Sequence, residues 1–195
     1  MKRIIDKLMK WSNIKGIGIS LGLFLVSVIT INGKIIGVEA MKRVSNGIGI
    51  LDLEPNYTVE KAYSMLEAMG QVGRNFYLFR IIPQDFIFPL TYGIAFSLII
   101  LFLIHRIMPK NEPALGLAYI PLTAMLFDFL ENICVIMILT QYPKQLVSVV
   151  QISNLFTMIK SSLLGFTMVM IALCVMVLLV KHGAGKVGLG KQSND

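Results

Sequence analysis

Four long apolar runs follow one another along the chain, with shorter polar segments between them. They cover approximately residues 16–36, 86–107, 116–140 and 155–180. About 20 apolar residues in a helix are enough to cross a ~30 Å hydrocarbon core, so each run predicts a membrane span. The pattern therefore predicts an all-α protein, a four-helix transmembrane bundle in one domain over residues 1–180. The Gly- and Lys-rich tail, residues 181–195, is expected to be disordered.

The long connection between the first two spans, residues 37–84, contains an amphipathic helix of its own. Thr58 is placed as its N-cap and Gly70 as its C-terminal stop. Its apolar stripe consists of Val59, Ala62, Tyr63, Leu66 and Met69. We expect this extra helix to lie on the membrane surface or to cap the ends of the spanning helices.

The composition agrees with an integral membrane protein, because 55% of the residues are hydrophobic and 15% are charged. A soluble domain has about 45–50% apolar and about 25% charged residues. The net charge of +7 comes from basic residues that flank the spans. Such residues contact anionic lipid headgroups, so we expect membrane lipid and no nucleic acid as a partner.

The first apolar run is open to two interpretations. Residues 38–40, Val-Glu-Ala, resemble a signal-peptide cleavage site, but a long polar segment separates them from the apolar core. We therefore expect a retained first helix. Gly18 and Gly22 form a small-residue face that would let this helix pack closely against a neighbour.

Four spans place both chain ends on the same side of the membrane. The short loop 105–113 is basic, and basic short loops stay in the cytoplasm. We expect a multi-pass protein of the cell membrane with both termini cytoplasmic and residues 37–84 outside.

The third run carries the strongest functional signal, because Asp128, Glu131 and Asn132 interrupt it near mid-membrane. Spacings of three and four residues place these side chains on one helix face. A purely structural patch is the alternative, but interhelical hydrogen bonds contribute only about 0.6–2 kcal/mol. Burying one carboxyl costs about 2.5–3.5 kcal/mol. We therefore interpret Asp128 and Glu131 as catalytic acid/base candidates and Asn132 as a ligand-binding residue, with at least one carboxyl neutral or ion-paired.

Residues from the other spans reach a similar depth. We expect Asp85, Tyr92 and Lys160 to face the same cavity, with Lys160 within salt-bridge distance of Glu131 or Asp85. The alternatives are that Lys160 reaches to the headgroups and that Asp85 is an ordinary acid at a helix N-terminus. Two further candidates, Arg74 and Arg80, are placed to meet an anionic headgroup.

Metal and cofactor chemistry find little support in the sequence. His105 lies near the opposite surface from Asp128 and Glu131, so no transition-metal site is expected. The chain has no zinc-protease helix motif, no nucleophile elbow and no phosphate-binding glycine loop, and no cofactor is expected. Cys134 and Cys174 fall inside spans and are interpreted as small buried residues.

Three motifs occur in a fixed order: Gly70-x-x-Gly73-Arg74, Asp85-x-x-Phe88-Pro89 and Asp128-x-x-Glu131-Asn132. In this order the chain resembles an uncharacterised family of small four-helix bacterial integral membrane proteins, over roughly residues 50–135. The resemblance implies the architecture and the importance of these residues, and it implies no reaction.

Two classes of function fit this pattern. In the first, a polar pocket in the outer half of the membrane binds or processes a lipid-like or amphiphilic molecule. In the second, the acids relay protons or cations in a small transporter that works as a homo-oligomer. A membrane partner subunit without chemistry of its own is a third interpretation.

Overall fold

The computed structural model describes residues 2–54, 56–109 and 112–190, which form helices and connecting turns without a strand. Four helical stretches in these residues are long and apolar enough to cross a membrane. They cover Ile14–Ile31, Gly70–Ile107, Ala114–Gln141 and Val147–His182. The predicted all-α bundle is confirmed, and the chain is a multi-pass helical membrane protein.

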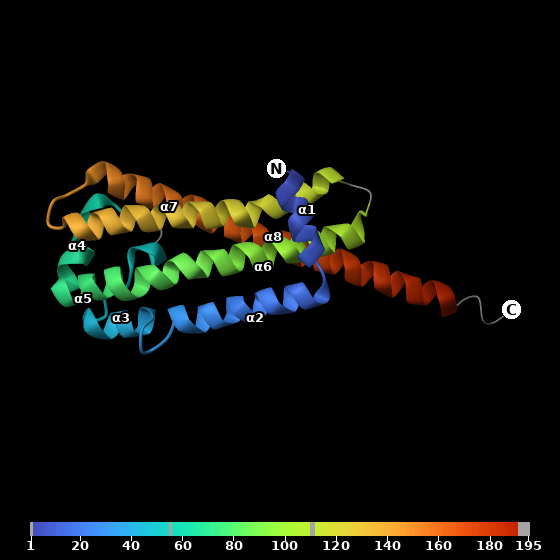
Figure 1. Cartoon of the computed structure of the whole chain (residues 1–195), viewed down its shortest axis with the longest axis horizontal. Helices are drawn as coiled ribbons and strands as arrows, with labels where there is room; N and C mark the ends of the chain where they lie inside the picture. The colour runs from blue at the N-terminus through green and yellow to red at the C-terminus, as the bar shows by residue number, and fades with distance from the viewer. Residues whose placement is uncertain (1, 55, 110–111, 191–195) are drawn as a thin grey trace.

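The spanning helices are α2 (Ile14–Ile31), α6 (Ile82–Ile107), α7 (Tyr119–Gln141) and α8 (Val147–Gly190), and they run along the long axis of the molecule (Figure 1). Helix α6 is central and packs against α2, α7 and α8. Helix α7 also packs along α8. Large apolar side chains of α2 and α8 face outward, as a lipid environment requires.

The two ends of the bundle differ. Helices α3 (Val38–Val44), α4 (Val59–Ala68) and α5 (Gly70–Phe76) lie at one end, which we call the α4 end (Figure 1). Helix α1 (Lys2–Trp11) lies at the other, the α1 end, which is also where α8 extends beyond the bundle.

Helix α4 closes the α4 end of the bundle. Thr58 caps it by accepting a hydrogen bond from the Lys61 backbone N–H at 3.2 Å, and Gly70 follows it with φ of +64°, as the sequence predicts. Ala62 and Leu66 are fully buried in a core that also contains Ile138 of α7. Of its two predicted positions, α4 therefore takes the one that covers the ends of the spanning helices.

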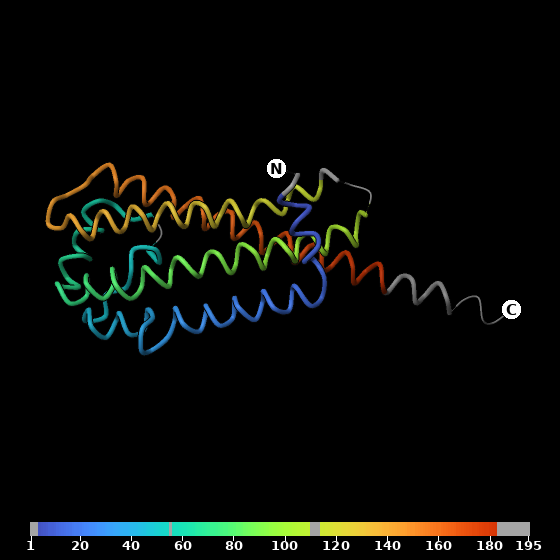
Figure 2. Tube along the Cα trace, in the orientation of Figure 1, coloured from blue at the N-terminus to red at the C-terminus, as the bar shows by residue number. Residues whose placement is uncertain are grey.

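The second span begins earlier than the sequence predicts. Residues 70–84, predicted as loop, are helical, and the chain passes from α5 through a π-helical turn, η2 (Tyr77–Ile81), directly into α6 (Figure 2). Burial against α4 and α7 stabilises this segment as helix, although Pro83 and Pro89 suggest a helix start. Pro89 consequently lies inside α6 and not at its beginning.

The other boundaries also shift. Helix α2 ends at Ile31, and α7 follows a 3-10 helix, η3 (Glu112–Ala118). Helix α8 starts eight residues before the predicted 155 and continues through Gly190, although we expected a disordered tail. Adding residues to an existing helix costs much less than nucleating one, which explains the extension. Residues 191–195 lie outside the described part of the chain.

The close approach of two helices depends on Gly93 and not on the predicted glycines of the first span. A Cβ added at Gly93 would lie 2.9 Å from Sδ and 3.0 Å from Cβ of Met125 on α7. At Gly18 and Gly22 an added Cβ would meet nothing within 4 Å. Gly93 therefore sets the distance between α6 and α7, directly beside Tyr92.

This difference predicts a contrast between two leucine variants. Gly93→Leu overpacks the α6–α7 contact and should destabilise the protein by about 1–3 kcal/mol. Gly18→Leu, the control, adds an apolar side chain in open space and should leave stability unchanged. Thermal unfolding in detergent measures both, and equal melting temperatures for the two variants would contradict this account.

Candidate functional site

Charged residues that lie far apart in the sequence meet inside the bundle. They are Asp52 of the 3-10 helix η1 (Leu51–Leu53), Asp85 of α6, Asp128 and Glu131 of α7, and Lys160 of α8. We call this set the acid cluster. It contains four carboxyls and one ammonium group.

Lys160 connects α8 to α7 through two ion pairs. Its Nζ lies 3.0 Å from Oδ1 of Asp128 and 2.5 Å from Oε2 of Glu131. Only 8% of Lys160 is exposed, so its ammonium group does not reach toward the headgroups. Burial in low dielectric favours such contacts, because an unpaired charge there costs several kcal/mol.

The remaining oxygens of these two carboxyls also have partners. The Tyr92 hydroxyl donates to Oδ2 of Asp128 at 3.0 Å. The Thr157 hydroxyl, one turn before Lys160 on α8, donates to Oε1 of Glu131 at 2.5 Å. Asp128 and Glu131 are therefore both ion-paired and hydrogen-bonded.

Asn132 has a role that follows from the proline in α6. Pro89 has no backbone N–H, so the carbonyl four residues earlier, that of Asp85, receives no helical hydrogen bond. The Asn132 side-chain N–H donates to this carbonyl at 2.8 Å. Two of the sequence motifs are thereby joined, because Asn132 on α7 completes the backbone bonding that Pro89 leaves open on α6.

Asp52 and Tyr77 belong to the site, although no site role was predicted for either residue from the sequence. The Tyr77 hydroxyl, from the π-helical turn, donates to Oδ1 of Asp52 at 2.6 Å. Burial opposes ionisation of Asp52, yet Lys160 and the contacts with Asp85 and Tyr77 hold the pKa of Asp52 below its ordinary value. The signal that was available is a single acid within a short apolar stretch of the loop, residues 48–53.

One oxygen on each of two carboxyls has no donor. No N–H or O–H group of the described residues donates to Oδ2 of Asp52 or to Oδ2 of Asp85, and both atoms are buried. Buried carboxyl oxygens without partners are costly in a stable structure. These atoms are the part of the acid cluster that is open to a further group.

A cavity of about 240 Å³ leads to these oxygens. The polar residues that line it are Asp52, Asp85, Asp128 and Lys160 of the acid cluster, with Asn32 and Ser161. The apolar residues that line it are Ile31, Val38, Ile50, Leu53, Phe88 and Leu164. Leu53 and Ser161 are exposed, so the cavity reaches the surface of the bundle between the end of α2 and the middle of α8.

Arg74 and Arg80 lie elsewhere. Arg74 donates to the backbone carbonyl of Leu66 at 2.6 Å, and its guanidinium group lies 4.0 Å from the centre of the Tyr142 ring. Arg80 is exposed. Neither arginine lines the cavity.

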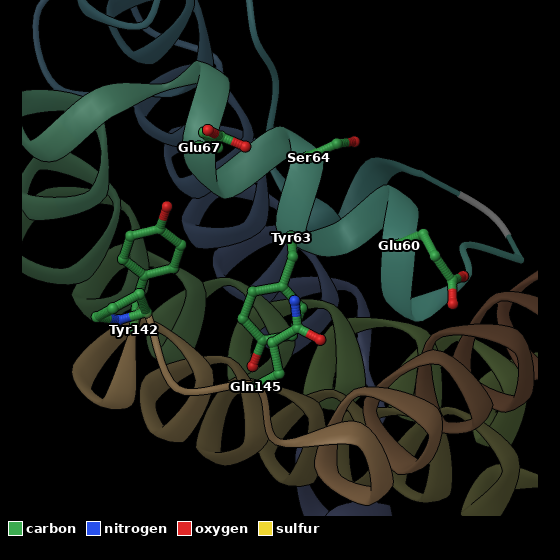
Figure 3. Close-up of a pocket in the computed structure, with 7 residues that line it drawn as sticks. Glu60, Tyr63, Ser64, Glu67, Tyr142 and Gln145 are labelled. Atoms are coloured by element: carbon green, nitrogen blue, oxygen red, sulfur yellow. The ribbon is translucent and has the colours of Figure 1, made fainter.

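A second hollow, of about 420 Å³, lies at the α4 end between α4 and the α7–α8 connection (Figure 3). Glu60, Glu67 and Tyr142 line it, but both carboxyls are exposed. The Tyr63 hydroxyl is already occupied by the Leu146 N–H at 2.7 Å and the Lys144 carbonyl at 3.1 Å. The acid cluster is thus the better candidate site, and Glu67 provides a control position.

Among the described residues, no three His, Cys, Asp or Glu side chains are arranged to hold a metal ion. Cys134 and Cys174 are free thiols. Comparison with family models, curated proteins and solved structures finds no match to this chain. The resemblance to a family of small four-helix membrane proteins therefore stays a prediction.

The role of Asn132 predicts an energetic coupling to Pro89. Asn132→Leu leaves the Asp85 carbonyl unpaired and should cost about 1–3 kcal/mol. In a Pro89→Ala background the backbone N–H of residue 89 bonds this carbonyl, so Asn132→Leu should cost less, with a coupling energy above about 0.5 kcal/mol. A double-mutant cycle by unfolding in detergent measures it, and strictly additive effects would contradict the assignment.

Proposed function

We propose that the protein binds the polar head of a lipid-like or amphiphilic molecule in the cavity beside the acid cluster. The observation that supports this best is the mixed lining of the cavity. Asp52 and Asp85, each with a donor-free oxygen, line it together with apolar side chains such as Phe88 and Leu164. An amphiphile likewise combines a polar head with an apolar chain.

The size of the cavity suits the polar head of an amphiphile and not a whole lipid molecule. A volume of about 240 Å³ equals roughly eight water molecules of liquid, whereas drug-sized ligands occupy about 300–1,000 Å³. The chain of the ligand would stay in the bilayer, beside the apolar outward face of α8. Ile31 of α2 and Leu164 of α8 both line the cavity, which supports entry between these two helices.

The contacts support different roles for the two acids of α7. Asp128 lines the cavity and is the candidate acid/base group, with Tyr92 and Lys160 as its partners. Both oxygens of Glu131 are engaged by Thr157 and Lys160, which suits a residue that positions the lysine.

The proposed orientation places both termini in the cytoplasm of a cell membrane and the α4 end outside. The basic loop 105–113 supports it, because short cytoplasmic loops are rich in Lys and Arg. In this orientation the acid cluster lies in the outer half of the membrane.

A second function is favoured by the Asp52 and Asp85 pair. Two buried carboxyls without another donor have a place for one proton between them, so proton- or cation-coupled transport is the alternative. Transport predicts pH-gradient-dependent flux in liposomes, whereas a binding site predicts saturable binding by the monomer without flux.

Binding is tested by filling the cavity. Leu164→Trp should weaken saturable binding of a fluorescent alkyl probe in nanodiscs by at least about tenfold, because the larger ring occupies space in the cavity. Leu173→Trp, on the exposed face of the same helix, is the control and should bind as wild type does. Equal affinity in both variants would place the binding site elsewhere.

Orientation is tested with single cysteines at Ser64 and Ser193 in a cysteine-free background. Ser64 is exposed on α4, so an impermeant maleimide should label it in intact cells and should leave position 193 unlabelled. Labelling at 193 but not at 64 would reverse the proposed topology.

A further inference from the structure

Two carboxyl oxygens of residues that line the cavity have no hydrogen-bond donor. Asp85 is 5% exposed, it lines the cavity, and its Oδ2 has no donor among the described residues. Asp52 also lines the cavity, and its Oδ2 likewise has no donor among the described residues. A bound group that donates at this point would satisfy both carboxyls at once.

Neighbouring donors are already committed. Lys160 forms its ion pairs with Asp128 and Glu131, and the Tyr77 hydroxyl is directed at Oδ1 of Asp52. The Asn132 amide N–H is directed at the Asp85 backbone carbonyl. A donor to the two Oδ2 atoms is therefore either a proton that the two carboxyls share or a group that binds from outside the cluster, and only a bound group also brings a positive charge.

The charge of the acid cluster also favours a particular kind of ligand head. The acid cluster contains four carboxyls against one ammonium group, so a cationic head reduces the imbalance and an anionic head increases it. The two arginines that the sequence suggested for an anionic head, Arg74 and Arg80, do not line the cavity. An anion would thus meet carboxyls without an arginine to balance it.

We propose that the amphiphile bound here carries a primary amine, and that its ammonium group binds between Asp52 and Asp85. This inference rests on the proposed function and specifies its ligand class. The protonated amine supplies N–H donors to the two free Oδ2 atoms, and charge-assisted hydrogen bonds of this kind are stronger than neutral ones. The alkyl part lies along Phe88 and Leu164.

The test compares probes with one chain length and different heads. Dodecylamine, dodecanol, dodecyl phosphate and dodecyltrimethylammonium compete with the fluorescent alkyl probe in phosphatidylcholine nanodiscs. Dodecylamine should compete at a concentration at least about tenfold lower than each of the others, because only it has both charge and N–H donors. Equal competition by dodecanol or dodecyl phosphate would overturn the amine proposal and leave the binding function standing. Saturable binding of none of the probes would refute the proposed function itself.

Variants of the two carboxyls test whether the preference for dodecylamine depends on this site. Asp85→Asn removes the ionisable carboxyl and adds an N–H donor, so it should abolish the preference for dodecylamine while the melting temperature stays at or above that of wild type. Glu67→Gln, an exposed acid in the second hollow, should keep the preference. If Asp85→Asn does not fold, Asp52→Asn provides the same comparison. A retained preference in a folded Asp85→Asn or Asp52→Asn protein would contradict the site.

Two sources of the amine are distinguished by nanodisc composition. If the natural ligand is the headgroup of phosphatidylethanolamine, adding that lipid should raise the dodecylamine concentration needed for competition. If the ligand is a separate amphiphilic amine, the competition curve should stay unchanged. A higher concentration identifies the phosphatidylethanolamine headgroup as a ligand of the site, and an unchanged curve excludes this source.

Discussion

The stability of the bundle depends on a counter-ion for two carboxyls that are buried away from water. Asp128 and Glu131 lie inside the membrane-spanning part of α7, and Lys160 of α8 binds both. Removing one partner of a buried ion pair costs about 3–5 kcal/mol, so the rotation and depth of α8 relative to α7 are fixed by these contacts. Thr157 and Tyr92 then complete the bonding from α8 and α6.

A backbone constraint adds to this electrostatic one. Pro89 leaves the Asp85 carbonyl open, and Asn132 closes it from α7, so the two helices are joined beside the acid cluster. Gly93 permits the close approach to Met125 of α7, and the adjacent Tyr92 of α6 meets Asp128, three residues after Met125 on α7. Together these features hold Asp85 beside a cavity that apolar side chains also line.

The sequence predicted the four spans and the face shared by Asp128, Glu131 and Asn132, because periodicity and burial cost are local signals. The role of Lys160 was predicted from its position along the fourth span, because that position and the length of its side chain place the ammonium group near the depth of Glu131. Asp52 and Tyr77 were missed, since their meeting depends on how a loop folds back and on a π-helical turn, which no local pattern encodes. The start of the second span was also missed, because packing under α4 stabilises residues 70–84 as helix.

Thermal unfolding of Lys160→Met, compared with Lys160→Met combined with Asp128→Asn and Glu131→Gln, tests the central claim that Lys160 is the counter-ion of the buried acids. The single variant should lose about 3–5 kcal/mol of stability, because it leaves two carboxyls in low dielectric without a cation. The combined variant should recover much of that loss, since neutral amides need no counter-ion. A single variant as stable as wild type, or a combined variant that recovers nothing, would contradict the account.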